Sequence, residues 1–183
     1  MSKIVIFLVG MPGAGKSTLV DFMATKSVPS VYFGGIVVNE VRNRGLEINE
    51  INEKQVREQL RASEGAGVMA KRIIPEIEHL FETHDMVVAD GLYSWTEYKI
   101  CKEHFGDNGV VIAVTAPRSI RHQRLAVRPL RPLNEEQVTA REYAEIENIE
   151  KGGPIANADY ILMNDQEPQN LIDQLEQILS SLK

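Results

Sequence analysis

Apolar runs recur along the chain and predict the strands of a buried sheet. The run from Lys3 to Val9, KIVIFLV, is apolar after its first residue, which is typical of a strand covered on both faces, as in a parallel sheet. Shorter apolar runs predict four more strands, at 30–33, 86–89, 110–114 and 158–163.

The segments between these runs are expected to be helical. The expected helices cover 16–26, 34–61 with breaks at Gly45 and 49–52, 64–82 with a kink or break at Pro75, 94–105, 118–128, 134–150, and the chain from Pro168 on. In the last of these, the apolar residues lie on one face. The alternation of strands and helices predicts a three-layer α/β/α fold with a mainly parallel, five-stranded sheet.

The segment from Gly10 to Ser17 matches the phosphate-binding pattern G-x-x-x-x-G-K-[ST] in full, between a predicted strand and a predicted helix. Glycines let the backbone N–H groups point at phosphate oxygens, and the following helix offers its positive end to the same anion. We expect Lys16 to reach the β- and γ-phosphates and Ser17 to bind Mg²⁺. The residues expected to hold the nucleotide are Gly10, Pro12, Gly13, Ala14, Gly15, Lys16, Ser17 and Thr18.

Asp90 follows the predicted strand 86–89, at the edge of the sheet where parallel strands bind ligands. P-loop enzymes place such an aspartate near Mg²⁺, directly or through water, so Asp90 is predicted to bind the metal together with Ser17. It is also a candidate base toward an acceptor hydroxyl group. The alternative is an aspartate that only stabilises a turn.

Five arginines fall within the fourteen residues 118–131: Arg118, Arg121, Arg124, Arg128 and Arg131. On a helix, the first four lie within about a third of the circumference. Guanidinium groups suit triphosphate charge and can stack on a base, so we predict catalytic roles for Arg124 and Arg128. Nearby prolines suggest a lid that excludes water. The alternative is a helix face paired with glutamates.

Length, charge and cysteine content indicate how many domains the chain forms and which partners and location to expect. The chain has 183 residues, which suits one domain (1–183), and its 26 acidic and 20 basic residues give a net charge of −6. A nucleic-acid partner is not expected for so acidic a chain. Cys101 is the only cysteine, which favours a reducing cytoplasm, and the first apolar run is too short to span a membrane. The four histidines show no metal-binding spacing.

Together these residues resemble the nucleoside-monophosphate-kinase-like branch of P-loop kinases. More narrowly, the chain is similar to a mostly archaeal family described as adenylate-kinase-related or dephospho-CoA-kinase-like. The resemblance covers almost the whole chain. It is carried by GMPGAGKS (10–17), RGL (44–46), REQLRASEG (57–65), VVADG (87–91), APRSIRHQRL (116–125) and IANADYILMND (155–165).

The resemblance implies a lid region (128–150), a base pocket near Arg124 and Asn164, and a helical acceptor-binding region (36–72). The residues implied to bind the acceptor are Gly34, Gly35, Arg42, Arg61, Arg72 and Gly91. The chain departs from the family pattern in two places. Gly35 and Val38 stand where an acidic residue and an arginine are usual, and Leu92 and Tyr93 follow the D-G pair where an arginine is usual.

We therefore expect a Mg²⁺-dependent kinase that transfers the γ-phosphoryl group of ATP, or of GTP, to a small acceptor. A nucleoside monophosphate or a related metabolite is the expected acceptor class, with a dephospho-CoA-type kinase as an alternative. The departures from the family pattern favour a third possibility, a nucleotide-hydrolysing switch. The chain is expected to act as a monomer or a homodimer.

Overall fold

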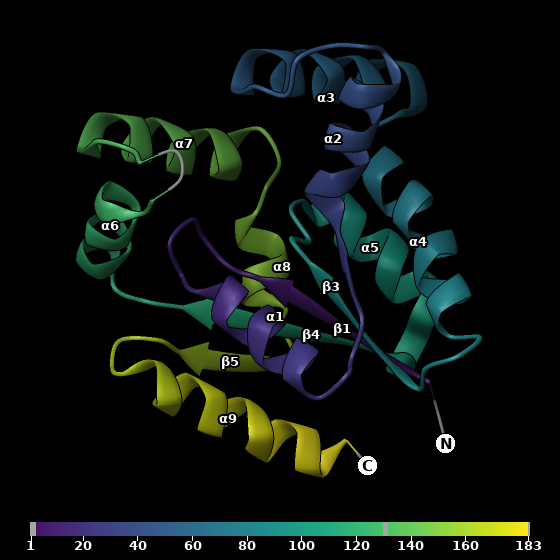
Figure 1. Ribbon diagram of the computed structural model, residues 1–183, viewed down its shortest axis with the longest axis vertical. Helices are drawn as coiled ribbons and strands as arrows, with labels where there is room; N and C mark the ends of the chain where they lie inside the picture. The colour runs from purple at the N-terminus through teal and green to yellow at the C-terminus, as the bar shows by residue number, and fades with distance from the viewer. Residues whose placement is uncertain (1–2, 130–131, 183) are drawn as a thin grey trace.

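The computed structural model describes residues 3–129 and 132–182, so Arg131 lies outside the described residues (Figure 1). Within them, five strands form one sheet: β1 (Ile4–Val9), β2 (Ser30–Tyr32), β3 (Met86–Asp90), β4 (Gly109–Thr115) and β5 (Tyr160–Met163). Their order is β2-β3-β1-β4-β5, and every neighbouring pair is parallel. The predicted α/β fold is confirmed, with a sheet that is parallel throughout rather than mainly so.

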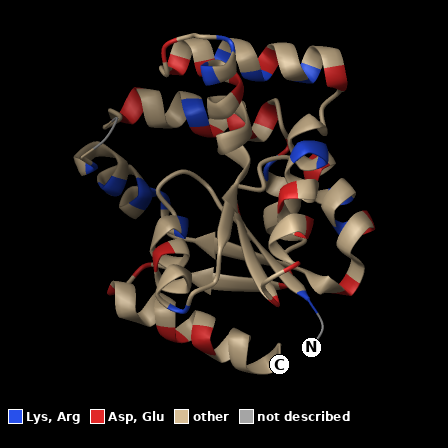
Figure 2. Cartoon of the chain, turned by 45° about the vertical axis from the view of Figure 1, so that its right-hand side comes forward, with Lys and Arg blue, Asp and Glu red and all other residues tan. Residues whose placement is uncertain are grey.

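The helices of the described residues are α1 (Lys16–Thr25), α2 (Phe33–Asn43), α3 (Glu50–Glu64), α4 (Val68–Leu80), α5 (Trp95–Phe105), α6 (Arg118–Val127), α7 (Glu135–Glu147), α8 (Gly152–Ala156) and α9 (Pro168–Ser181), with a 3₁₀ turn, η1 (Gly106–Asn108). Buried residues of α1 and α9 pack on one face of the sheet, and those of α2, α4 and α5 form the core on the other face. Acidic and basic residues lie mainly on the helices, whereas the strands are largely uncharged (Figure 2).

Several helix boundaries differ from the prediction: α3 begins at Glu50, inside the break expected at 49–52, and α7 ends at Glu147 rather than at 150. Pro75 lies inside α4 without breaking it, on the exposed side, where water can satisfy the carbonyl group that the proline ring leaves without a donor. The break lies instead at Gly65, with φ of 91°, so α3 ends at Glu64 and α4 begins at Val68. Directly after the helix predicted for 134–150, the segment Gly152–Ala156 forms the short helix α8.

Helices α2, α3 and α7 lie at the end of the molecule opposite to α9 (Figure 1). The predicted acceptor-binding region, 36–72, corresponds to α2, α3 and the first turn of α4. Most of the predicted lid, 128–150, is helix α7, which contacts α6. The two regions therefore stand above the sheet on separate helical arms.

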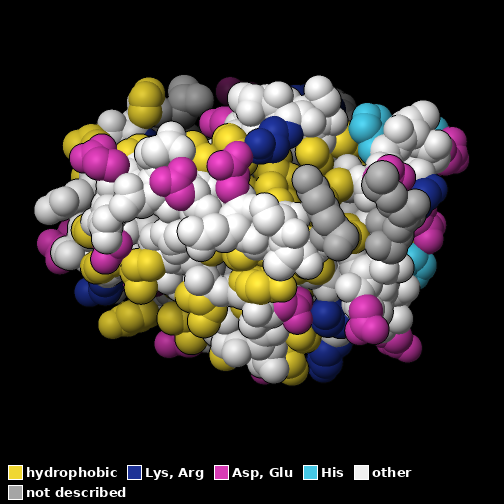
Figure 3. Space-filling view, turned by 90° about the horizontal axis from the view of Figure 1, so that it is seen from below, with side chains coloured by type: hydrophobic (Ala, Val, Ile, Leu, Met, Phe, Trp, Pro, Cys, Tyr) yellow, Lys and Arg dark blue, Asp and Glu magenta, His cyan; other side chains and the backbone are white. Residues whose placement is uncertain are grey.

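The end of the molecule that carries α9 mixes apolar and charged side chains on its surface (Figure 3). At the sheet edge, β5 exposes Ile161 to 62% and Met163 to 47%, beside a shallow groove of 350 Å³ between β5 and α9. The expectation of a monomer or homodimer stays a prediction. No helix in 3–129 or 132–182 is both long and apolar enough to cross a bilayer.

Candidate nucleotide and acceptor site

The loop between β1 and α1 has a conformation that requires glycine. Gly13 has φ of 79°, and a Cβ atom there would lie 2.6 Å from the carbonyl oxygen of Arg121. Gly15 has φ of 100°, and its Cβ would lie 2.0 Å from the Asn164 amide nitrogen. Positive φ angles and close neighbours both exclude larger residues. The loop is therefore folded as the phosphate-binding motif predicts, packed between α6 and the end of β5.

Lys16 begins α1 and curls back over the loop. Its Nζ atom donates a hydrogen bond to the carbonyl of Gly10 over 3.0 Å. Burial lowers the pKa of Lys16, while the negative charges of Asp90 and Glu145 raise it and the positive charge of Arg141 lowers it. Ser17, the next residue, is exposed, so its hydroxyl group is accessible to a metal ion.

Asp90 ends β3 directly beside β1, where it pairs in register with Leu8. Its Oδ1 atom is buried and has no hydrogen-bond partner within the described part of the chain. Burial raises the pKa of Asp90, and the positive charges of Lys16 and Lys151 lower it. A buried oxygen without a partner costs free energy, which a bound cation would offset. The donor set of Asp90 and Ser17, both oxygen ligands, therefore fits Mg²⁺.

Arg124 and Asn164, which the resemblance assigns to a base pocket, lie together beside the P-loop. Asn164 is buried, and its Nδ2 atom donates to the carbonyl of Ala14 over 2.8 Å. Arg124 donates from Nη1 to the Asn164 carbonyl over 3.0 Å and from Nη2 to its Oδ1 over 3.3 Å. Arg124 is thus fixed between α6 and the end of β5, and its contact with a base stays a prediction.

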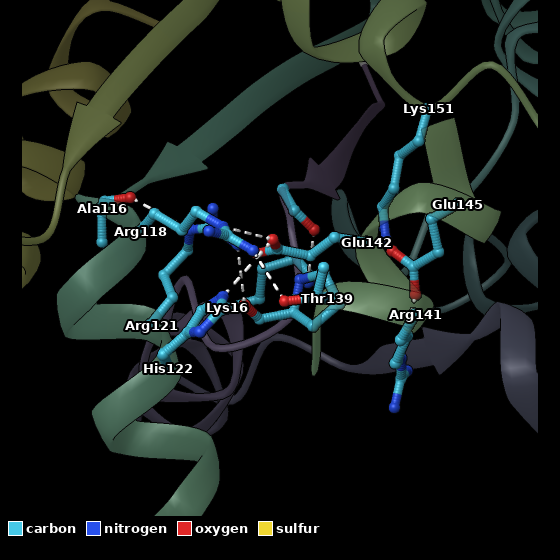
Figure 4. Close-up of polar contacts among 12 residues, drawn as sticks. Lys16, Ala116, Arg118, Arg121, His122, Thr139, Arg141, Glu142, Glu145 and Lys151 are labelled. Atoms are coloured by element: carbon cyan, nitrogen blue, oxygen red, sulfur yellow. Dashed lines mark hydrogen bonds and ion pairs between the residues drawn. The ribbon is translucent and has the colours of Figure 1, made fainter. Parts of the chain in front are cut away.

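The first part of the arginine run binds a glutamate of α7. Three basic side chains of α6 converge on the buried Glu142 of α7 (Figure 4): Arg118, Arg121 and His122. Arg121 also donates to the carbonyl of Pro12 in the P-loop over 3.4 Å. Arg118 and Arg121 therefore pair with a glutamate, as the alternative to a ligand-binding role proposed. These pairs join α6, α7 and the P-loop.

A cavity of 1220 Å³ lies between the arm of α2 and α3 and the arm of α7. Of the predicted residues, Gly34, Arg61 and Arg128 line it. Further cations that line the cavity come from both arms: Lys54, Arg57 and Arg141. The cavity also carries acidic residues, Glu50, Glu53, Glu58 and Glu145, and an aromatic and aliphatic floor.

Two of the arginines predicted to bind the acceptor are not among the lining residues of this cavity. Arg72 pairs with Glu64 at 2.5 Å and with Glu40 at 3.4 Å, and so connects α4 to α3 and α2. Arg42 donates to the side chain of Asn39 over 3.0 Å on the exposed side of α2. Gly35 and Gly91 do not line the cavity either: a Cβ on Gly91 would lie 2.9 Å from the Tyr93 ring, which covers it.

Arg61 is held in the cavity wall by a buried carboxylate that sequence reasoning missed. Glu97 is fully buried, and its Oε2 atom accepts from the backbone N–H groups of Tyr93 and Ser94 over 3.1 and 3.0 Å. Its Oε1 atom lies 3.7 Å from Arg61 Nη2. Burial raises the pKa of Glu97, and Arg61 and these hydrogen bonds lower it. The S-x-x-E spacing of a helix cap, 94–97, was the available signal.

A second network that the sequence did not reveal lies between the P-loop and the cavity. Lys151, at the start of α8, is 2% exposed, and its Nζ atom lies 2.5 Å from Glu145 Oε2. Arg141 reaches the other oxygen of Glu145 over 3.1 Å, so the two cations approach this carboxylate from opposite sides (Figure 4). The ammonium group also lies 4.7 Å from the centre of the Tyr93 ring. A lone lysine before Gly-Gly-Pro has no motif to mark it.

Comparisons with known proteins agree with this geometry. The model of the AAA domain family matches residues 6–150. A protein of Thermococcus onnurineus named UPF0200 is 34% identical over 88% of this chain and 88% of its own length. A UPF0200/UPF0201 protein of Archaeoglobus fulgidus is 32% identical over 97% of this chain. The chain spans 55% of that relative, or about half its length.

Solved structures share the fold. TT1252 from Thermus thermophilus superposes with a TM-score of 0.66 at 20% identity, covering both chains fully. Shikimate kinase from Acinetobacter baumannii, solved in complex with shikimate, gives a TM-score of 0.60 at 22% identity over 99% of this chain and 95% of its own. The fold is thus kinase-like, and the chain belongs to the AAA domain family and to the proteins named UPF0200.

Proposed function

We propose that this protein is a Mg²⁺- and ATP-dependent phosphotransferase that acts on a small acceptor. The observation that carries this proposal is the cavity beside the P-loop. Tyr93, which lines the cavity, interacts electrostatically with Asp90. Glu145, which also lines it, interacts electrostatically with Lys16. A hydrolase needs only water next to the nucleotide. A kinase must hold a second substrate in line with the γ-phosphoryl group, which requires a pocket in this position.

Each residue of the P-loop side has a role in this proposal. Lys16 neutralises charge on the β- and γ-phosphates, and the backbone N–H groups of 10–15 cradle them. Ser17 and Asp90 would hold Mg²⁺, which would supply positive charge against the negative charge of the transferring phosphoryl group. Asp90 also interacts electrostatically with Tyr93, which lines the acceptor cavity, so it is the candidate base as well. Arg124 and Asn164 border the nucleotide, with ATP favoured and GTP as the alternative.

The cavity suits an acceptor that carries an anionic group and an apolar or aromatic part. Arg57 and Arg61 approach from α3, and Arg128 and Arg141 from the opposite arm. Guanidinium groups on two sides favour a phosphate or carboxylate, and Tyr32 and Phe33 offer aromatic surface. A nucleoside monophosphate or a nucleotide-like metabolite has this combination. The same description admits a dephospho-CoA-type acceptor.

The arm of α7 would act as the lid over the transferring group. It is tied to the P-loop through Glu142 and Arg121, and its Arg141 and Glu145 face the cavity. Closure over the acceptor would exclude water and so suppress hydrolysis of ATP. The reaction needs no disulfide, membrane or nucleic acid, and the buried Cys101 thiol suits the cytoplasm as the location.

The first test measures ADP release from ATP and Mg²⁺ with and without a panel of acceptors. The panel holds the common ribo- and deoxyribonucleoside monophosphates and dephospho-CoA. We expect strong stimulation by one acceptor, and we expect Lys16→Ala to lower that rate at least about 100-fold while the protein stays folded. Lys26→Ala, at an exposed lysine paired with Glu176, is the matched control.

A flat panel with slow background hydrolysis would contradict the kinase proposal. Hydrolysis that increases with a protein partner would then favour a nucleotide-dependent switch. Unchanged turnover in Lys16→Ala would contradict the assignment of the P-loop site itself.

A further inference from the structure

Lys151 is buried to a degree that is unusual for a lysine. Its side chain is 2% exposed, and burial lowers its pKa to about 8 although Glu145 raises it. Removing an ammonium group from water costs free energy, which the ion pair with Glu145 and the Tyr93 ring offset in part. A lysine whose burial costs free energy in this way is expected to have either an essential packing role or a function.

The surroundings of Lys151 point to the phosphate site. The positive charge of Lys16 lowers the pKa of Lys151, and the charge of Lys151 lowers the pKa of Asp90. Lys151 therefore stands within electrostatic reach of both groups that hold the nucleotide phosphates and Mg²⁺. Its partners Tyr93 and Glu145 line the acceptor cavity. The ammonium group thus lies at the boundary between the two substrate sites.

Like charges lie close together around Lys151. Lys16 and Arg141 each lower the pKa of Lys151. The carboxylates that interact with these three cations are Asp90, Glu145 and, for Arg141, Glu50. An ion pair that served packing alone would gain from distance to further cations. Cations held close to a buried ammonium group are instead the environment that stabilises an incoming anion.

On this basis we propose that Lys151 is a further phosphate-binding cation of the site, which pairs with Glu145 in the absence of nucleotide and turns to the γ-phosphoryl group when ATP is present. This inference rests on the proposed function. The Glu145 carboxylate is the anion that a phosphate oxygen would replace as the partner of Lys151. The exchange moves no covalent bond: one ion pair, Lys151 with Glu145, is replaced by one between Lys151 and phosphate oxygen, while Arg141 keeps its contact with Glu145.

The test compares the binding of two probes by isothermal titration calorimetry in the presence of Mg²⁺: β,γ-imido-ATP, which has a γ-phosphoryl group, and ADP, which lacks it. The double variant Lys151→Met/Glu145→Gln removes the lysine without leaving an unpaired carboxylate. We expect it to bind imido-ATP about tenfold more weakly and ADP within about twofold of the unchanged protein. Equal affinity of the double variant and the unchanged protein for imido-ATP would overturn the proposal.

The single variant Glu145→Gln separates this role from a packing role. If Glu145 competes with phosphate for Lys151, its neutral form raises the ratio of imido-ATP to ADP affinity, by about threefold. If the pair only holds α7 against α8, the variant lowers that ratio or leaves it unchanged, and the proposal fails. This variant decides the question even where the double variant does not fold.

Lys102→Met provides the matched control. Lys102 is a partly buried lysine that donates to the Gly109 carbonyl over 2.9 Å and lies 3.5 Å from Asp159, away from the P-loop. We expect the ratio of imido-ATP affinity to ADP affinity in Lys102→Met to equal that of the unchanged protein. Because these measurements contain no acceptor, their result does not depend on whether the acceptor panel identifies a substrate. A failure here and a failure of the proposed kinase reaction are therefore distinguishable.

Discussion

Asn164, directly after β5, donates a hydrogen bond from its side-chain amide to the carbonyl of Ala14 over 2.8 Å, across 150 positions of sequence. The same amide lies where a Cβ atom of Gly15 would stand. Its side-chain oxygen Oδ1 accepts from Arg124 of α6 over 3.3 Å. One buried side chain thus joins the last strand, the P-loop and the arginine-bearing helix.

Replacing this side chain tests its importance for the loop. We expect Asn164→Ala to lower the free energy of unfolding by about 1–3 kcal/mol, because the buried Ala14 carbonyl loses its donor. We also expect weaker nucleotide binding, since the loop is no longer held from this side. Chemical denaturation and calorimetry with imido-ATP measure the two effects. Asn170→Ala, at an exposed position of α9, should change stability by less than about 0.5 kcal/mol. Equal effects of both variants would contradict this role.

Asp90→Asn is expected to separate stability from activity. The folded-state pKa of Asp90 lies above its ordinary value of 3.8, so the folded protein binds the proton more tightly. The free energy of unfolding therefore falls as the pH rises from 3.8 through the folded-state pKa of Asp90. The destabilisation by the buried, charged carboxylate persists at neutral pH. Asp90→Asn removes the buried charge and with it this destabilisation. We therefore expect its melting temperature at pH 7 to be no lower than that of the unchanged protein.

The same variant loses the proposed metal ligand, so we expect phosphoryl transfer to fall at least about 100-fold. Thermal scans without nucleotide and turnover with Mg²⁺ test both parts. A lower melting temperature with retained turnover would show that the aspartate acts only in folding.

Arg57→Gln addresses the acceptor cavity. Arg57 lines the cavity and has only a weak ion pair with Glu50, at 4.0 Å, so its removal leaves no buried partner. We expect the KM for the acceptor to rise about tenfold, as one contact to an anionic group is lost. The KM for ATP should stay constant. Arg42→Gln, at an exposed arginine outside the cavity, is the control. An acceptor KM raised equally by both variants would refute the placement of the acceptor.

The lowered pKa of Lys151 predicts that the stability of the protein depends on pH in the alkaline range. Its folded-state pKa of about 8 lies below the ordinary value of 10.5, so between these values the unfolded chain binds more protons than the folded one. Stability should therefore rise as the pH increases from 8 toward 10.5, by roughly 3 kcal/mol at most, at about 1.4 kcal/mol per pH unit. The comparison of the unchanged protein with Lys151→Met by denaturant unfolding at pH 7 and pH 10 isolates this contribution. Parallel pH profiles of the two proteins would contradict it.

The parts of the site that sequence could predict are local in the chain. The P-loop needs only eight consecutive residues with a strand before and a helix after, and Asp90 needs only the end of one strand. The arginine run was ambiguous, because the same spacing serves a ligand or an ion pair. The decisive partner, Glu142, lies 21 positions from Arg121 on another helix.

The network of Lys151 and Glu145 was beyond prediction for the same physical reason. The two residues are six apart, but their contact depends on the backbone between α7 and α8, where Glu150 takes a positive φ of 53° that few non-glycine residues adopt. Arg72 had a convincing position in the predicted acceptor region, yet two glutamates on neighbouring helices engage it. Which cations face a cavity is decided by tertiary packing.

The position of β1 in the sheet has a consequence for how the protein reaches its fold. The partners of β1 lie much later in the chain and begin at Met86 and Gly109, so the central pairings close loops of about eighty and a hundred residues. Such distant contacts form slowly, since chain entropy is lost before they stabilise anything. Until then the apolar segment Ile4–Val9 has both edges open in the growing chain. The interval between the synthesis of β1 and that of β4 therefore leaves this segment exposed to aggregation and open to binding by a chaperone.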